Sequence, residues 1–249
     1  MKLGITYNLF DGEELLEASI KSVRECAEHI NVVYQTTSNW GEKASENMED
    51  ILSDLVKRKL VDKIYKYHPK KTSAGKNELK KRNIGLNICK MNFCSHFLNM
   101  DCDEFYIKEQ FDNAKKFIIE NDIYSSSCSF SNYIKKPTWK IVEKSPMYVP
   151  FIAKINLFSS INRKKYFPVL VDPTRKLNGS KKFKYFESDQ LEMQHMWGVR
   201  NDLNKKFNNS SGKKFTTQEL VHEILNYEFP NKIFNSKVIE VENRFNIKI

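Results

Sequence analysis

The chain has 249 residues, of which 40% are hydrophobic, and this length is enough to bury a sizeable core in one large domain. Lysine and arginine number 41 against 31 aspartate and glutamate residues, and the net charge of +10 suits a nucleic acid, an anionic membrane surface or a phosphorylated substrate without choosing among them. Five cysteines without a CxxC spacing argue against a disulfide framework and against a structural zinc site.

Strands alternate with amphipathic helices in the first half of the sequence. Residues 3–7 have the composition of a short buried strand, and Asp11 followed by Glu14 has the spacing of a helix capping box. Apolar residues then recur at steps of four and three from Leu16 to Ile30, which predicts a helix with one buried stripe. The next predicted elements are a strand at 31–34, a helix at 48–55, a strand at 63–67, a helix at 78–90 and a strand that ends at Asp101.

The second half of the sequence has a different pattern. After Asp122 it shows short β-like stretches at 124–130, 147–155 and 166–171, divided by prolines. The strand–helix–strand order that precedes them predicts parallel pairing and an open α/β sheet with right-handed crossovers. Ligands bind at the carboxyl ends of the strands in such sheets. The polar segments 7–8, 35–39 and 101–104 are therefore expected to share one rim of a single domain, residues 1–249.

The strand that ends at Asp101 leads directly into a group of carboxylates, Asp101-Cys102-Asp103-Glu104. Side chains two residues apart in an extended chain point to the same face, so Asp101 and Asp103 are expected to converge. Paired carboxylates of this kind suit a hard divalent cation or a diphosphate bound to such a cation. The simpler interpretation is a solvated acidic turn that closes the strand, so the surrounding sequence has to decide between the two.

A basic helical segment precedes the carboxylates, and it contains Gly75-Lys76-Asn77 and Lys81-Arg82-Asn83-Ile84-Gly85. Two later segments, 171–176 and 192–200, contain Asp172 and His195. In this order the segments resemble family 2-type glycosyltransferases of the GT-A fold, and the later two resemble bacterial surface-polysaccharide transferases. The resemblance implies an open mixed sheet flanked by helices, with a smaller β-rich half. Residues 1–107 would bind the nucleotide-sugar, and residues 108–249 would face the acceptor.

The resemblance also implies an activity and its cofactor. It implies a glycosyltransferase that moves a sugar, with inversion, from a nucleotide-diphosphate sugar to a saccharide during bacterial capsule or lipooligosaccharide assembly. Mn²⁺ or Mg²⁺ would neutralise the leaving diphosphate, and an imidazole ligand favours Mn²⁺. The implied metal ligands are Asp101, Asp103 and His195. The implied donor contacts are Thr6, Asn8, Gln35, Lys76, Arg82 and Asp101.

The acceptor hydroxyl requires a general base within hydrogen-bond reach. Glu192, three residues before His195, is the first candidate, and Asp172 is the second. For each of these carboxylates a purely structural role is the alternative interpretation. Lys76 has the same alternative, since it would be an ordinary exposed residue of its helix.

Two other classes of function share some of these features. A nucleotidyltransferase also uses an α/β sheet, a metal and paired carboxylates, but residues 7–11 lack the Gly-rich phosphate loop that normally follows its first strand. A nucleic-acid-binding domain would use the surplus positive charge, but the basic residues are scattered and form no known nucleic-acid motif, so we expect no nucleic-acid partner. No apolar run approaches the roughly 20 residues of a membrane span, which predicts a cytoplasmic protein with the anionic inner-membrane surface as a peripheral contact.

Overall fold

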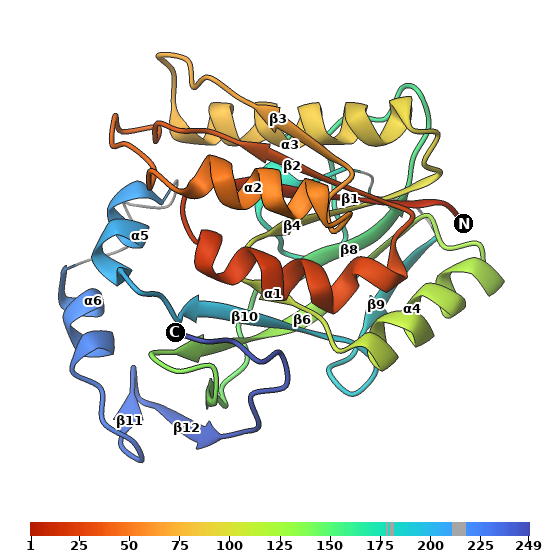
Figure 1. Ribbon diagram of the computed structural model, residues 1–249. Coiled ribbons are helices and arrows are strands. Elements are labelled where there is room, and N and C mark those ends of the chain that lie inside the picture. The colour runs from red at the N-terminus through yellow and green to blue at the C-terminus, as the bar shows by residue number, and fades with distance from the viewer. Residues whose placement is uncertain (178, 180–181, 211–217) are drawn as a thin grey trace.

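The computed structural model describes residues 1–177, 179, 182–210 and 218–249. Within these residues the strands form a mixed sheet in the order β11-β12-β7-β6-β8-β4-β1-β2-β3, with β10 beside β5 and β6 and with β9 beside β6 (Figure 1). The helices are α1 Glu13–Val23, α2 Met48–Lys57, α3 Ala74–Met91, α4 Lys108–Glu120, α5 Leu203–Asn209 and α6 Gln218–Leu225, with 3-10 turns η1 Arg24–Cys26 and η2 Pro173–Arg175. The strands are β1 Leu3–Leu9, β2 His29–Tyr34, β3 Lys63–Lys66, β4 His96–Asp101, β5 Glu104–Phe105, β6 Ser125–Ile134, β7 Trp139–Ile141, β8 Val149–Lys154, β9 Phe183–Phe186, β10 Glu192–Gly198, β11 Lys232–Ile233 and β12 Ser236–Glu240.

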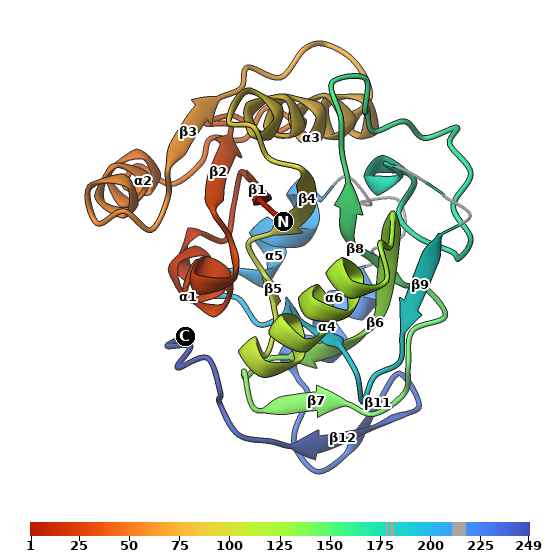
Figure 2. The same cartoon turned by 90° about the vertical axis from the view of Figure 1, so that its right-hand side faces the viewer.

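The first half of the chain forms the parallel part of the sheet, which confirms the predicted α/β architecture. β1 lies between β2 and β4 and pairs with both in parallel, and β3 extends the sheet from β2. Every residue of β1 and β2 is buried, which is typical of parallel strands covered on both faces. Figure 2 shows α3 on one side of these strands and α1 and α4 on the other.

Three local predictions from the sequence are wrong. Gly12, in a left-handed conformation, is the N-cap of α1, so the predicted capping box from Asp11 does not form. Helix α1 ends at Val23, and the buried stripe continues to Ile30 only because β2 is itself buried. Residues 166–171 form no strand, and Pro168 within them cannot donate a backbone hydrogen bond to a sheet.

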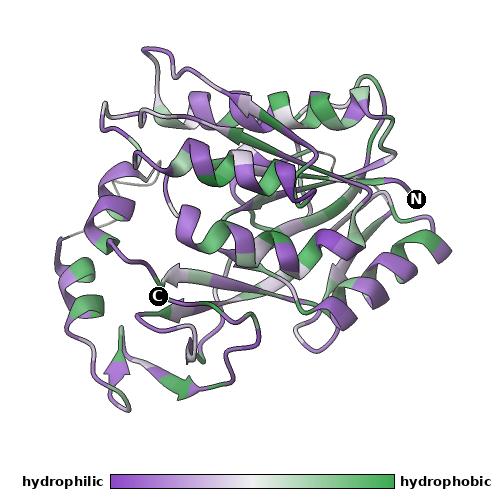
Figure 3. Cartoon of the chain, in the orientation of Figure 1, coloured by the Kyte–Doolittle hydropathy of each residue, from purple (hydrophilic) through white to green (hydrophobic). Residues whose placement is uncertain are grey.

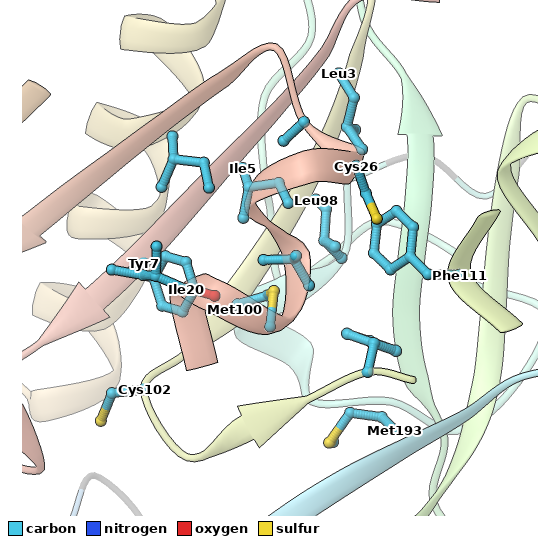
Figure 4. Close-up of a cluster of buried hydrophobic side chains, with 14 of the residues drawn as sticks. Leu3, Ile5, Tyr7, Ile20, Cys26, Leu98, Met100, Cys102, Phe111 and Met193 are labelled. Carbon is cyan, nitrogen blue, oxygen red and sulfur yellow. The ribbon is translucent and has the colours of Figure 1, made fainter. Parts of the chain in front are cut away.

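The main core fills the space between the sheet and helices α1 and α4. Leu3, Ile5 and Tyr7 of β1 alternate along one face and pack toward Ile20 of α1 and Phe111 of α4 (Figure 4). Figure 3 shows hydrophobic residues concentrated along the inner strands and both colours on the helices, as expected when one helix face is buried. Because side chains alternate across a strand, the other residues of β1 point to the opposite face, which α3 covers.

Helix α3 lies unusually close to β1. A Cβ atom on Gly85 of α3 would lie 2.0 Å from the Thr6 Cγ2 atom, so only glycine allows this approach. The close contact places Arg82, one turn before Gly85, beside Asn99 and Asp101 of β4. The position of Arg82 therefore depends on the close packing that Gly85 allows.

A second hydrophobic cluster supports the C-terminal elements. It includes Trp139, Leu203, Phe207 and Val238, and it packs Leu203 and Phe207 of α5 beside β7 and β12. The rings of Trp197 on β10 and Phe207 lie 5.4 Å apart, which holds α5 against the end of β10. The described helices include none long and apolar enough to span a membrane, and all five cysteines are free and buried.

Candidate functional site

The carboxyl ends of β1, β2 and β4 meet on the α3 side of the sheet. Asn8 of β1 is the register partner of Asp101 on β4 and of Val33 on β2. Gln35 follows β2 and donates its backbone N–H to the Leu9 carbonyl, 3.1 Å away. The alternation of side chains puts Asn8 on the same face as Thr6, whose hydroxyl lies 3.6 Å from the Cys89 Sγ atom of α3. Three strands therefore contribute polar groups to one rim, as the sequence predicted.

The side chains of Asn8 and Gln35 are buried at this rim, and three of their polar atoms lack hydrogen-bond partners among the described residues. Asn8 is 6% exposed and Gln35 is 1% exposed. Neither amide atom of Asn8 nor the Oε1 atom of Gln35 has a partner within the described part of the chain. Buried polar groups are nearly always paired, so these atoms are candidates for contacts with a ligand.

Thr6 lies below the rim rather than on it. Its side chain is fully buried, and its hydroxyl donates to the Asn31 Oδ1 atom at 3.1 Å. The prediction that Thr6 contacts the donor is therefore wrong, because α3 covers it. Lys76, in the first turn of α3, is exposed to solvent.

Asp101 is paired with two guanidinium groups. Its Oδ2 atom lies 3.3 Å from the Arg82 Nη2 atom and also accepts a hydrogen bond from Arg175 of η2. Arg175 additionally donates from Nη1 to the Glu104 Oε2 atom at 3.0 Å. Burial alone would raise the pKa of Asp101, but Arg175 and Arg82 outweigh it and lower the pKa to about 2. Asp101 is therefore an ionised carboxylate that the two arginines hold in place.

Asp103 is surrounded by a different set of positive groups. Its Oδ2 atom lies 2.8 Å from the Lys206 Nζ atom, 3.0 Å from the Arg200 Nη2 atom and 3.6 Å from the His195 Nε2 atom. The Asp103 side chain is only 7% exposed. Burial would raise its pKa, but Lys206, Arg200 and His195 together hold the pKa well below the usual range.

His195 reaches Asp103 because β10 pairs antiparallel with β5, where His195 is the register partner of Glu104. Its Nδ1 atom lies 3.0 Å from the Asn132 Oδ1 atom of β6. This contact orients the ring, with Nε2 facing Asp103 at 3.6 Å. This is the outer hydrogen bond that commonly orients a metal-binding histidine.

The predicted metal set of Asp101, Asp103 and His195 is not brought together as three ligands. Among the described residues no group of three or more His, Cys, Asp or Glu side chains is arranged to hold a metal ion. Both aspartates are paired with basic side chains, Asp101 with Arg82 and Arg175, and Asp103 with Arg200 and Lys206. Asp103 and His195 nevertheless converge to 3.6 Å, and these two could supply ligands to a divalent cation that takes its remaining ligands from a diphosphate and water.

Glu192 lies on the opposite face of β10 from His195, so its prediction as the general base is wrong. Residues three apart in a strand face opposite ways. The Glu192 carboxylate lies 2.6 Å from the Lys140 Nζ atom and accepts a hydrogen bond from Ser131 at 2.8 Å. It lines a separate cavity with Gln110 and Arg244.

Asp172 does reach the rim. Its Oδ2 atom lies 3.8 Å from the Arg82 Nη2 atom, and its side chain is 42% exposed. It is also the N-cap of η2, where it accepts the Thr174 backbone N–H at 2.8 Å. Asp172 is thus close to the donor-side residues and accessible from solvent.

Three residues at this site were not predicted from the sequence. Arg175 and Lys206 pair with the two aspartates, and Asn132 contacts His195. Arg175 stands in the same short segment as Asp172, and this proximity was the only sequence signal for it. Lys206 and Asn132 carry no such signal, because their contacts depend on how β6, β10 and α5 pack together.

Comparison with known proteins supports the fold. No protein-family model and no curated sequence matches the chain. Among solved structures, TarS from S. aureus matches with a TM-score of 0.50 and 14% identity over 78% of this chain and 36% of that chain. GalNAc-T7, solved with UDP, GalNAc and Mn²⁺, matches with a TM-score of 0.50 and 12% identity over 84% of this chain and 46% of that chain.

These neighbours are glycosyltransferases of the GT-A fold, and the likeness shows that this chain has the same fold. The matches span less than half of the length of either neighbour. At such low identity the comparison establishes architecture only. The activity has to be argued from the rim itself.

Proposed function

We propose that the protein is a glycosyltransferase that uses a nucleotide-diphosphate sugar as donor and a saccharide as acceptor. The observation that carries the proposal is the convergence of Asp103 and His195, together with the buried polar atoms of Asn8 and Gln35 that have no partner among the described residues at the ends of β1 and β2. GT-A structures such as GalNAc-T7, solved with UDP and Mn²⁺, support this assignment of the rim.

The donor is proposed to lie across the ends of β1, β2 and β4. The Asn8 amide and the Gln35 Oε1 atom, which have no partner in the described part of the chain, are available for the base or the ribose. Asp101, ionised and held by Arg82 and Arg175, offers a carboxylate for ribose hydroxyls. Lys76 is exposed at the start of α3 and remains a candidate contact for the phosphates.

Asp103 and His195 would hold the divalent cation, Mn²⁺ in preference to Mg²⁺ because of the imidazole. When bound, such a cation acts as a Lewis acid that neutralises charge on the leaving diphosphate. The residues of the chain prepare the site. Asn132 fixes the ring of His195, and Arg200 holds the Asp103 carboxylate between β10 and β5.

We assign Asp172 as the general base, because it is the exposed carboxylate next to Arg82 at this rim. It would remove the proton from the acceptor hydroxyl as that oxygen attacks the anomeric carbon and the bond to the diphosphate breaks. The proposal also includes inversion, a role in bacterial surface-polysaccharide assembly and an acceptor side at residues 108–249, and these parts rest on the family resemblance. A cytoplasmic location with peripheral contact to the inner membrane is proposed from the sequence, which has no long apolar run and a net charge of +10.

Donor binding is expected to raise the thermal stability of the protein. A ligand that binds only the folded state at about 100 times its Kd adds about 2.7 kcal/mol of stability. We expect UDP or another nucleoside diphosphate to raise Tm in the presence of Mn²⁺ and to have much less effect in EDTA. Differential scanning fluorimetry with a panel of nucleoside diphosphates measures this, and the nucleoside monophosphates serve as controls. Absence of a shift with every nucleotide would contradict the proposed function.

His195→Ala is expected to raise the Mn²⁺ concentration that gives half-maximal UDP binding by at least about 10- to 100-fold, the range known for loss of even an outer-shell partner. Stability without metal should change little, because His195 is partly exposed and its described polar contacts are Asn132 and Asp103. Titration of UDP binding against Mn²⁺ provides the measurement. His222→Ala on α6, a histidine outside the rim, is the matched control. An unchanged Mn²⁺ requirement would remove His195 from the metal site.

A further inference from the structure

Lys206 occupies an unusual position for a lysine. Its Nζ atom lies 2.8 Å from the Asp103 Oδ2 atom and donates a second hydrogen bond to the Trp197 carbonyl. The Lys206 side chain is only 14% exposed. Leu203 and Phe207 anchor α5 on either side of it in the second hydrophobic cluster. The ammonium group is therefore held at the rim by the fold.

The ammonium group of Lys206 and a divalent cation would compete for the Asp103 carboxylate. The Oδ2 atom that Lys206 contacts also lies 3.6 Å from the His195 Nε2 atom and 3.0 Å from the Arg200 Nη2 atom. A cation bound between Asp103 and His195 would meet these positive charges at close range, where repulsion is strong in a poorly solvated site. Arg200 is also held by contacts with Cys102 and Glu14, so Lys206 is the group that would leave Asp103 when a metal ion is bound there.

The displaced ammonium group would need a new anionic partner. Among the described residues, Asp103 is the carboxylate that the Lys206 ammonium contacts, and the Trp197 carbonyl is its other hydrogen-bond acceptor. A buried ammonium without a counter-charge is strongly unfavourable. Asp101 and Glu104 are already paired with Arg175, and Arg82 also contacts Asp101. The phosphate oxygens of the donor are the anions that the proposed reaction brings to this place.

We propose that Lys206 is a diphosphate-binding residue that occupies the metal position in the ligand-free protein and passes from Asp103 to the phosphate oxygens when cation and donor bind. The inference rests on the proposed function, since it assumes a nucleoside diphosphate at this rim. Lys206 then has two opposite effects. It weakens the binding of the metal ion alone, and it strengthens the binding of the diphosphate.

Lys206→Met separates the two effects, because methionine keeps the apolar stem and removes the charge. We expect the variant to bind Mn²⁺ alone about tenfold more tightly and to bind UDP at saturating Mn²⁺ about tenfold more weakly, as befits one hydrogen bond to a charged group. Electron paramagnetic resonance of free Mn²⁺ gives the first affinity, and calorimetry with UDP gives the second. Lys205→Met is the matched control, since Lys205 lies on the same helix and pairs with Asp11 at 3.6 Å. It should leave both affinities unchanged.

Shifts in the same direction, or no change in either affinity, would overturn the inference, because a residue with only a structural role does not move the two in opposite directions. Lys206→Arg keeps the charge and is expected to restore UDP binding, which guards against a methionine variant that folds poorly. Failure of the proposed function would give a different result. The wild-type protein would then not bind UDP even with Mn²⁺, and this would contradict the inference about Lys206 as well.

Discussion

Replacement of Arg175 by methionine is expected to destabilise the protein by about 3 to 5 kcal/mol, the usual effect of removing one partner from a buried ion pair. The Arg175 side chain is 6% exposed and contacts both Asp101 and Glu104. Glu104 is only 4% exposed, so the variant leaves a buried carboxylate without its guanidinium. Methionine fills a similar volume, which limits the effect of a cavity. Urea unfolding followed by circular dichroism measures the change.

The destabilisation of Arg175→Met should depend on pH. Burial raises the pKa of Glu104, and Arg175 opposes this increase. Without Arg175 the folded-state pKa rises further above the unfolded value, so folding favours the protonated carboxyl. Stability from such a group is present at low pH and is lost as pH rises through the folded-state pKa. The deficit is therefore expected to be smaller near about pH 5 than near about pH 8.

The double variant Arg175→Met with Glu104→Gln is the control for this interpretation. A neutral amide can be buried at lower cost than an unpaired carboxylate, so the double variant should be more stable than Arg175→Met at neutral pH. It should also lose the pH dependence. A single variant as stable as the wild type at both pH values would show that the Arg175 contacts contribute little to the fold.

Much of the parallel sheet could be predicted from the sequence, because its signals are local. The apolar runs of β1 and β4 and the periodic residues of α2 determine those elements over a few residues each. The position of Asn8 beside Asp101 follows from strand order alone, since the ends of parallel strands share one edge. The rim could therefore be predicted from the sequence.

The partners of the rim residues could not be predicted in the same way. Arg175 and Lys206 lie 74 and 103 residues from the aspartates that they contact. Apart from the proximity of Arg175 to Asp172, nothing local distinguishes them from the other basic residues of a chain with 41 lysines and arginines. The error over Glu192 had a local cause. Its position three residues before His195 suggests a shared site, but the strand period places residues three apart on opposite faces.

Asp172→Asn is expected to lower the rate of sugar transfer by about 10²- to 10⁴-fold, the range found when a general base is removed. The asparagine amide can still cap η2 by accepting the Thr174 backbone N–H, so the fold should persist. The Asp172 side chain is the accessible carboxylate beside Arg82, and the amide cannot take a proton from the acceptor. Donor affinity should therefore change much less than the rate. Release of nucleoside diphosphate from the donor in the presence of acceptor, alongside calorimetric binding of UDP, measures both quantities.

Glu192→Gln is the informative comparison for Asp172→Asn. Glu192 is the first candidate from the sequence, but its carboxylate contacts Lys140 and Ser131 on the opposite face of β10 from His195. Its replacement should lower stability by about 1 to 3 kcal/mol, as for other buried polar groups that lose a charged partner, and should leave the transfer rate near that of the wild type. The reverse pattern, with a large loss of rate for Glu192→Gln and little for Asp172→Asn, would place the acceptor in the cavity beside Lys140. The reacting hydroxyl would then have to approach the donor from the face of β10 opposite His195.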